Sequence, residues 1–327
     1  MSFIWRNYIT FEIKFEAMKY CYFLMVLCLW LLVSCEQPED PPSNNFPYLT
    51  VDYRFSDPEV SVYSRHLAVT SDNGAVIYTG ETKGETTNHI YNRATSYVKP
   101  LVQMTTADST ALAGYAVDLD GEDRVYYHQL YQVKEDSVVH RIYRADLTMN
   151  LGSPPPEVVC SFDHLLVGFS EEGSSAADHL TVSSDGLTFI IGWNEVGFYY
   201  LDLRGDEPIS SILKDVVEAV FFPDGIRYVY ADGLDNIYLA SIGEHEPEYI
   251  GNGRHISVSE DGKVAWVKNQ LLHLYDVDTK KITQYNPPKN VASAQDLMNA
   301  TLSPDGRHLA FRSYDHLDSD IVFCSLP

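Results

Sequence analysis

A seven-residue pattern that occurs six times is the feature of this chain that most restricts its fold. Each copy is largely apolar and ends in an Asp that is followed by Gly, or by Asn73 and Gly74 in the first copy. The copies occupy residues 66–72, 114–120, 179–185, 218–224, 255–261 and 299–305. Their terminal Asp residues stand 48, 65, 39, 37 and 44 positions apart. Such a period indicates that one supersecondary unit is repeated along the chain.

The residues after each pattern predict the rest of the unit. Asp-Gly supplies a residue with positive φ, which a tight hairpin needs, and a second apolar strand follows each time. Third strands are expected at residues 89–91, 141–143, 198–200, 236–238, 273–275 and 320–323. Fourth strands are expected at residues 98–104, 157–160, 209–213, 247–250 and 281–285. A four-stranded unit of about 40 to 50 residues is typical of a propeller blade. The sequence therefore predicts an all-β fold, a six-bladed β-propeller of four-stranded blades.

The sixth copy has no fourth strand of its own, because the sequence stops at Pro327 just after the third. Residues 48–54 alternate apolar and polar side chains at strand period and belong to no copy. We expect this N-terminal strand to pair with the last blade and close the ring, which removes an exposed sheet edge.

Two of the copies resemble a known family. The run Ser-Pro-Asp-Gly-Arg-His-Leu-Ala-Phe at 303–311, followed by Asp-Ile-Val-Phe at 320–323, is similar to the repeats of TolB-like β-propellers, and so is Phe-Pro-Asp-Gly at 222–225. The resemblance covers residues 48–325 and implies the fold more than the function, since members include partner-binding periplasmic proteins, peptidase accessory propellers and polysaccharide lyases. The first three copies depart from the family pattern because they lack Pro before Asp-Gly.

The N-terminus is typical of a bacterial lipoprotein. Residues 21–33 are uncharged and too few to span a bilayer, and they follow Met18 and Lys19 as the hydrophobic region of a signal peptide would. Leu-Val-Ser before Cys35 resembles a lipobox, which makes Cys35 the predicted site of lipid attachment. The alternative is an uncleaved anchor helix. We expect residues 1–34 to be a signal peptide whose true start is Met18, residues 35–47 to be a lipidated tether, and residues 48–327 to be the propeller.

Charge narrows the range of partners. The chain has a net charge of −23, and about −24 remains once residues 1–34 are removed. Nucleic acid is not expected as a partner, because phosphate binding needs clustered Lys and Arg. The acidic residues just after Cys35 are compatible with an outer-membrane lipoprotein on the periplasmic or cell-surface face. Cys160 and Cys324 are left either unpaired or joined in a disulfide.

One set of side chains is a candidate site. The first position of the repeat holds His66, Gly114, His179, Glu218, His255 and Asn299. Equivalent positions of the innermost strands form a ring around a propeller channel, so His66, His179, Glu218, His255 and Asn299 are predicted to bind a ligand. His66, His179 and His255 are the candidate ligands of a divalent metal, because imidazole with carboxylate suits such ions. The alternative is that each side chain bonds to a neighbouring blade and holds it in register.

No catalytic residue is predicted. The sequence contains neither Gly-x-Ser-x-Gly nor His-Glu-x-x-His, and no base or nucleophile stands beside the histidines. We therefore expect a membrane-tethered binding or scaffold module for a protein or carbohydrate partner. The alternative function is a metal-dependent carbohydrate-active enzyme, similar to a lyase, that uses the histidines at the channel mouth.

Overall fold

The computed structural model describes residues 45–56, 61–82, 85–92, 97–100, 110–113, 116–134, 137–147, 156–163, 177–193, 196–205, 209–244, 246–289, 297–315 and 318–326. The chain divides into two units, residues 1–43 and 44–327, and only the second contains described residues. The predicted signal peptide and Cys35 lie outside them. In the described part of the chain, no helix is long and apolar enough to cross a membrane.

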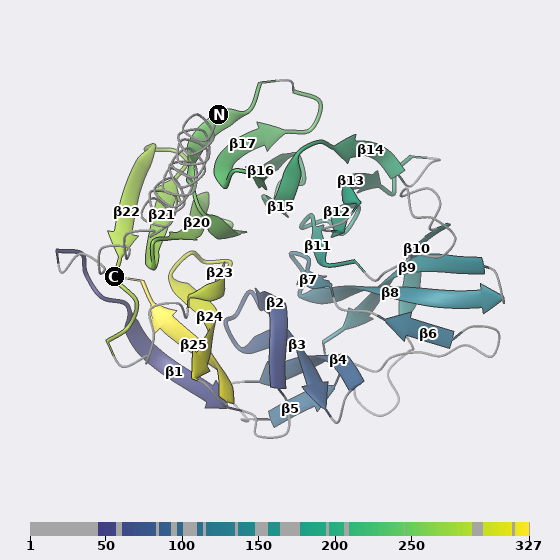
Figure 1. Ribbon diagram of the computed structural model, residues 1–327, viewed down its shortest axis with the longest axis horizontal. Helices are drawn as coiled ribbons and strands as arrows, with labels where there is room; N and C mark the ends of the chain where they lie inside the picture. Colours follow the sequence, from purple (N-terminus) through teal and green to yellow (C-terminus); the bar gives the residue numbers. More distant parts are fainter. Residues whose placement is uncertain are drawn as a thin grey trace, which may run out of the picture. The chain divides into compact units, whose positions relative to one another are not determined.

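The described residues form six antiparallel sheets arranged in a ring, here numbered as blades 1 to 6 (Figure 1). Blade 1 contains β2 (Ser61–Val69), β3 (Ala75–Thr82), β4 (Glu85–Asn92) and β5 (Tyr97–Pro100). Blade 2 contains β6 (Thr110–Ala113), β7 (Val117–Leu119), β8 (Arg124–Lys134), β9 (Ser137–Asp146) and β10 (Glu157–Asp163). Blade 3 contains β11 (His179–Val182), β12 (Thr188–Trp193), β13 (Gly197–Asp202) and β14 (Ile209–Leu213). Blade 4 contains β15 (Val216–Phe221), β16 (Arg227–Asp232), β17 (Asn236–Ser241) and β18 (Glu248–Asn252). Blade 5 contains β19 (Arg254–Val258), β20 (Lys263–Lys268), β21 (Leu271–Asp276) and β22 (Lys281–Tyr285). Blade 6 contains β23 (Met298–Leu302), β24 (His308–Asp315), β25 (Asp318–Ser325) and β1 (Thr50–Ser56).

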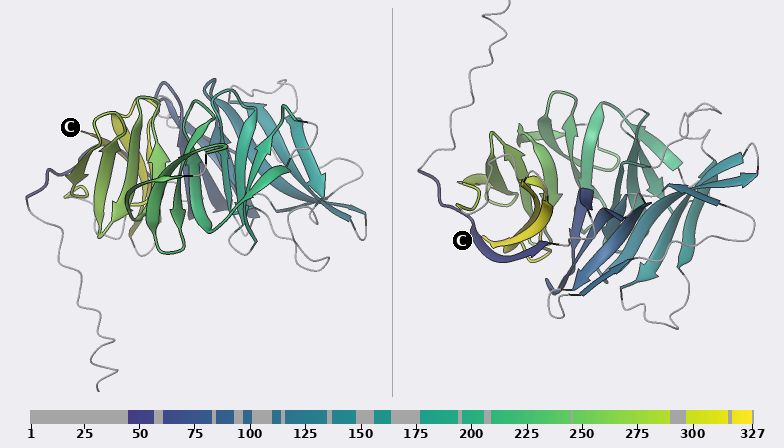
Figure 2. Two further views of the ribbon diagram at one scale, coloured as in Figure 1. Left: turned by 90° about the horizontal axis from the view of Figure 1, so that it is seen from above. Right: turned by 60° about the horizontal axis from the view of Figure 1, so that its bottom comes forward.

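The all-β propeller predicted from the repeat is confirmed. Five of the six sheets have four strands, as expected, whereas blade 2 has five because β6 and β7 both pair with β8. The β8 and β9 strands of that blade are also the longest of the fold and project outward from the ring (Figure 2).

The ring closes as the sequence predicts. β1 pairs antiparallel with β25, from Thr50 opposite Ser325 to Ser56 opposite Asp320. Just before β1, Tyr48 forms a bridge to Asn286 of blade 5, and Leu49 is buried between blades 5 and 6. The N-terminal segment therefore joins the last two blades.

The hydrophobic core lies between the blades. Six separate clusters of buried residues each combine side chains from two adjacent blades. In β12, Phe189 and Ile191 face blade 2 while Ile190, between them, faces blade 4. Because both faces of an inner strand are covered, such strands are apolar at successive positions instead of alternating with polar residues. Each blade is thus stabilised mainly by its neighbours.

The hairpins confirm the expected turn chemistry in five copies and correct the second. Gly186, Gly225, Gly262 and Gly306 have positive φ, and Asn73 takes this conformation in the first copy. In blade 2 the equivalent residue is Asp123, not Gly121. Its amide donates to the Asp120 carbonyl as that of Gly186 donates to Ser183. The second copy is therefore shifted by two residues from the sequence alignment, and Ala116, not Gly114, occupies its first position. Gly114 itself lies outside the described residues.

The two remaining cysteines are not joined. Cys160 in blade 2 and Cys324 in blade 6 are both buried free thiols. Of the two alternatives left by the sequence, the unpaired one holds.

Candidate functional site

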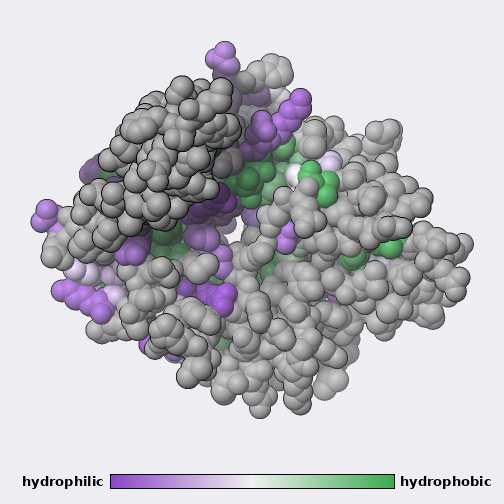
Figure 3. All heavy atoms as spheres, in the orientation of Figure 1, coloured by the Kyte–Doolittle hydropathy of each residue, from purple (hydrophilic) through white to green (hydrophobic). Residues whose placement is uncertain are grey.

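A cavity of about 170 Å³ lies at the centre of the ring, where the innermost strands meet. We call it the channel. His179, Glu218, His255 and Asn299 all line it, which places four of the five predicted ligand-binding residues at one cavity. The fifth, His66, lies in β2, but its side chain is outside the described part of the structure. Figure 3 looks into the ring, where hydrophilic residues border the central opening.

The channel is acidic. The described residues that line it include five carboxylates and no Lys or Arg. The carboxylates belong to Asp118, Asp120, Asp123, Glu218 and Glu260. Such a site attracts positively charged groups, because a cleft lined by one sign of charge concentrates its own field.

Two ring residues hold neighbouring blades together. The His179 imidazole bonds to the carbonyl oxygen of Ala219 in blade 4. The Glu218 carboxylate accepts the amide of His255 at 2.9 Å through Oε2 and that of Ile256 at 2.7 Å through Oε1, both in blade 5. These bonds match the structural alternative for His179 and Glu218. The prediction that they also bind a ligand stays a prediction.

The other two ring residues have an unusual backbone. His255 and Asn299 both adopt positive φ, 59° and 58°, at the same position of adjacent blades. The pairing of β19 with β20 and of β23 with β24 shifts register at these points. Bulges of this kind re-aim a side chain, and positive φ in non-glycine residues is concentrated at functional sites. Burial, and then the positive charge of Arg254, lowers the pKa of His255, which favours the neutral form of its imidazole.

The metal prediction is not supported by a ligand cluster. Among the described side chains, no three His, Cys, Asp or Glu residues lie close enough together to hold an ion. Since the His66 side chain is not described, a divalent metal on His66, His179 and His255 stays a prediction.

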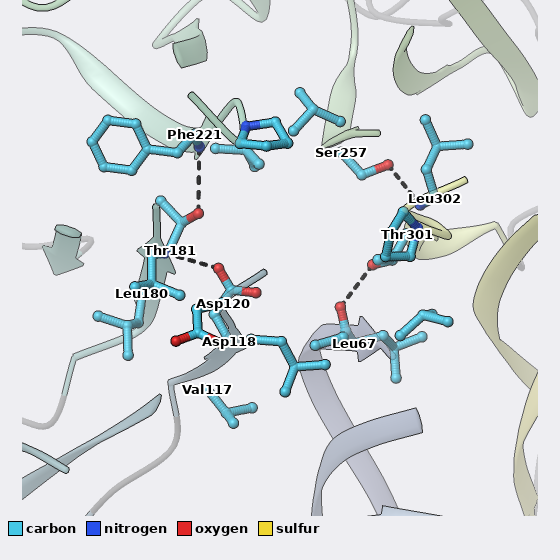
Figure 4. A pocket seen from close by; sticks show the side chains of 18 of the residues that line it. Leu67, Val117, Asp118, Asp120, Leu180, Thr181, Phe221, Ser257, Thr301 and Leu302 are labelled. Carbon is cyan, nitrogen blue, oxygen red and sulfur yellow. Dashed lines mark hydrogen bonds between the residues drawn. The ribbon is translucent and has the colours of Figure 1, made fainter. Parts of the chain in front are cut away.

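A second ring, which the sequence reasoning missed, lies two residues further along the inner strands. Val182 N–H donates to Asp118 Oδ2 at 2.9 Å, and Phe221 N–H donates to Thr181 Oγ1 at 3.3 Å. Leu302 N–H donates to Ser257 Oγ at 3.0 Å, while the Thr301 hydroxyl donates to the Leu67 carbonyl at 2.9 Å. Figure 4 shows the last three of these bonds crossing between blades.

The second ring is interrupted at blade 4, where Glu218 contacts the next blade instead. Blades 1 and 4 have Ala68 and Val220 where the other four blades have Asp, Thr or Ser, and neither side chain can accept a hydrogen bond. Glu218, two residues before Val220, instead accepts amides of the next blade. The signal in the sequence was a polar side chain at the third position of the inner strand in four of the six blades.

Burial perturbs two of the channel carboxylates. It raises the pKa of Asp118 to about 6 and that of Glu218 to about 7, and in both cases this outweighs the lowering effect of the backbone amides that donate to them. Both groups therefore titrate near neutral pH. A ligand that brings positive charge into the channel would favour their ionised forms.

We expect Asp118→Asn to make the folded protein more stable at about pH 8, by roughly 1–2 kcal/mol. The folded-state pKa of Asp118 lies above its ordinary value of 3.8, so the stability linked to its proton is lost as the pH rises through about 6. Asn keeps an oxygen for the Val182 amide without the charge, and the difference should vanish below about pH 4. Urea unfolding at both pH values measures it. Asp276→Asn is the control and should instead make the folded protein less stable at about pH 8. Hydrogen bonds from Thr279 lower the pKa of Asp276, so its charged form favours the folded state.

Comparisons with known proteins agree on the fold. No protein-family model matches the sequence, and no curated protein matches it. The crystal structure of TolB from Acinetobacter baumannii is similar, with a TM-score of 0.52 and 15% sequence identity over 77% of this chain and 64% of TolB. A structure of the mitotic checkpoint complex is similar with a TM-score of 0.53 and 12% identity, over 90% of this chain and 96% of that chain. This chain thus spans less than two thirds of TolB. At these identities the likeness shows a β-propeller fold alone.

Proposed function

We propose that this protein is a membrane-tethered lipoprotein whose propeller is a binding module for a protein partner, and that the channel receives a positively charged segment of that partner. The observation that carries the proposal is the make-up of the channel, with five carboxylates and no Lys or Arg among its described lining. The β-propeller fold is itself consistent with a binding or scaffold role.

A positively charged segment fits the channel better than an anion does. The net charge of about −24 after removal of residues 1–34 repels anions from the whole domain. A cationic ligand placed beside Asp118 and Glu218 would also offset the cost of burying their negative charges. It would therefore stabilise the charged forms that the fold disfavours. Partner binding should then release protons at about pH 6 to 7.

The alternative of a metal-dependent carbohydrate-active enzyme has less support. His179 and Glu218 are both engaged in bonds between blades. A catalytic role would require these groups to leave the partners that hold the ring together.

A hexalysine peptide tests the channel. We expect it to bind the protein at about 150 mM NaCl with micromolar affinity. Asn299→Trp, which adds a large side chain to the channel lining, should abolish binding, whereas Ile226→Trp should not, because Ile226 is 59% exposed and outside the channel lining. Equal binding by all three proteins would mean that the peptide is held by the acidic surface in general, and the proposal would fail.

Cys35→Ser tests the anchor. We expect the variant to lose acyl labelling and to move from the membrane fraction to the soluble fraction, since each buried CH₂ of an acyl chain contributes about 0.8 kcal/mol and an acidic domain adds no attraction to an anionic surface. Cell fractionation with immunoblotting measures the distribution. Ser34→Ala, which keeps a small residue before the cysteine, should stay in the membrane fraction. Retention of Cys35→Ser on the membrane would contradict lipid anchoring at this residue.

A further inference from the structure

A second cavity, of about 250 Å³, lies between blades 5 and 6, away from the channel. One wall comes from β20, β21 and β22 of blade 5, and the other comes from the hairpin before β24 and from Leu326, which follows β25. We call it the junction pocket. Small-molecule sites usually measure about 300 to 1,000 Å³, so a cavity just below this range suits one small group.

Three strands of blade 5 place charged side chains in one row. Lys263 in β20 pairs with Asp276 in β21, which in turn pairs with Lys281 in β22. Because directly paired residues point to the same face of a sheet, the three side chains lie side by side. Leu274, two residues before Asp276, packs in the cluster between blades 5 and 6. The row therefore faces blade 6.

The hairpin of blade 6 adds a third cation to this row. The Lys263 ammonium bonds to Asp261 and donates to the Gly306 carbonyl at 3.2 Å, which holds the hairpin against blade 5. Arg307 comes next in the chain, and its carbonyl accepts the amide of Leu326 at 2.8 Å. The backbone that carries Arg307 is thus held both by blade 5 and by the segment after β25.

Two of the three cations are available to a ligand. Neither Lys281 nor Arg307 forms an ion pair within the described residues, whereas Lys263 is paired with Asp261. The described lining holds a single carboxylate, that of Asp276, which accepts both the amide and the hydroxyl of Thr279 at 2.8 Å. With three cations against one carboxylate, the junction pocket is a positively charged site on a negatively charged domain.

A buried hydroxyl adds a neutral donor. Tyr285 lines the pocket and is only 6% exposed, yet its hydroxyl makes no hydrogen bond within the described part of the chain. Burial raises the pKa of Tyr285, an effect that the charge of Lys263 partly opposes, so the hydroxyl stays protonated and can donate. Such a donor needs an acceptor in the cavity, which is either an ordered water or a ligand oxygen. Thr283, two residues earlier on the same face of β22, also lines the pocket.

We propose that the junction pocket binds a phosphate group, either as free phosphate or as a small phosphate monoester. A phosphate has at least three strong acceptor oxygens, which suit cations on two walls with hydroxyl donors beside them, whereas a carboxylate has only two oxygens in one plane. The net charge of the domain does not prevent binding, because exposed charges more than about 8 Å away are largely screened at physiological ionic strength. This site shares no lining residue with the channel, so it does not depend on the function proposed above.

Phosphorus NMR of the full-length protein in detergent tests the site, at about pH 8 and constant ionic strength. We expect the resonance of inorganic phosphate or of glucose 6-phosphate to shift saturably, with millimolar affinity. Tighter binding of glucose 6-phosphate would identify the ligand as a monoester, and the reverse would identify it as free phosphate. Binding should weaken several-fold at about pH 5.5, because the dianion gains a proton with a pKa near 6.

Lys281→Gln and Arg307→Gln should each weaken this binding about tenfold, because each removes a charge-assisted hydrogen bond. Lys280→Gln is the matched control. Lys280 carries the same charge next to Lys281, but it is paired with Glu248 and lies outside the pocket lining, so its variant should bind like the unaltered protein.

The Arg307 variant is expected to fold normally, because the equivalent residues of blades 3 and 4 are Leu187 and Ile226, so the hairpin does not need an Arg there. Three results would overturn the proposal. They are the absence of saturable binding by both phosphate compounds, unchanged binding by Lys281→Gln and Arg307→Gln, and equal weakening by Lys280→Gln, which would indicate general surface charge. Hexalysine binding by Arg307→Gln should equal that of the unaltered protein, so failure at the junction pocket is distinguishable from failure at the channel.

Discussion

Deletion of residues 36–56 is expected to destabilise the whole propeller instead of trimming one edge. It removes β1, whose backbone pairs with β25 over most of its length, together with the Arg54 ion pair to Asp320. It also removes Leu49 from the cluster between blades 5 and 6, and Tyr53 and Phe55 from the edge of the cluster between blades 6 and 1. The last blade would then expose both a strand edge and apolar surface.

Because each blade is stabilised mainly by its neighbours, loss of the packing at one junction between blades should destabilise the other blades as well. We expect the melting temperature to fall by more than about 10 °C, or the protein to aggregate, as an open edge with exposed apolar surface does. Differential scanning calorimetry measures it. Deletion of residues 36–44 is the control and should leave the melting temperature unchanged, because the sequence predicts a polar, Pro-rich tether there. If both deletions melt alike, β1 does not close the ring.

The fold was predictable because the repeat combines a period with a turn signal. Asp followed by Gly marks both the end of the inner strand and a residue with positive φ, and residues 48–54 could be assigned to the last blade only because they belonged to no copy. The closing strand differs from that range only at its ends.

The second copy of the repeat could not be aligned correctly with the other five from the amino-acid sequence alone. Asp120 occupies the place that Ser or Thr occupies in most blades, and Arg124 N–H donates to its carboxylate at 3.0 Å much as Lys263 N–H donates to Ser259 Oγ at 3.1 Å. A carboxylate and a hydroxyl both accept this bond, so the chemistry is kept while the residue pattern shifts. The Asp120-Gly121 pair then imitates a turn that in fact has Asp123 at its positive-φ position.

The location of the candidate site could be predicted from the sequence, but the hydrogen-bond partners of its side chains could not. Periodicity placed His179, Glu218, His255 and Asn299 at one cavity, because equivalent positions of a closed ring must converge. The hydrogen-bond partner of each side chain is set by the backbone of the next blade. The sequence of one repeat does not specify that backbone. The same holds for Asp118, whose acceptor role depends on an amide 64 residues further along the chain.

Glu218 offers the sharpest test of whether the first ring is structural. We expect Glu218→Ala to destabilise the protein by about 2 kcal/mol at about pH 6, since it leaves the amides of His255 and Ile256 without an acceptor in a partly buried site. At that pH the carboxyl is mostly protonated, because burial raises its pKa to about 7. The cost of burying its charge therefore contributes little.

Glu218→Gln separates the hydrogen bonds from the charge. At about pH 6 it should be less harmful than Ala, because its amide oxygen still accepts a bond. At about pH 8.5 we expect the Glu218→Gln protein to be more stable than the native protein, by roughly 1–2 kcal/mol. The raised folded-state pKa means that stability linked to the Glu218 proton is present in acid and lost as the pH rises through about 7.

Urea unfolding of the three proteins at the two pH values provides the measurement. If Glu218 were held only for a ligand, removing it would relieve an unfavourable buried group, and Ala would be neutral or stabilising at both pH values. Hexalysine titration of Glu218→Gln then completes the assignment. Binding weakened several-fold, with stability kept, would mean that the carboxylate which joins blades 4 and 5 also contributes charge to the channel.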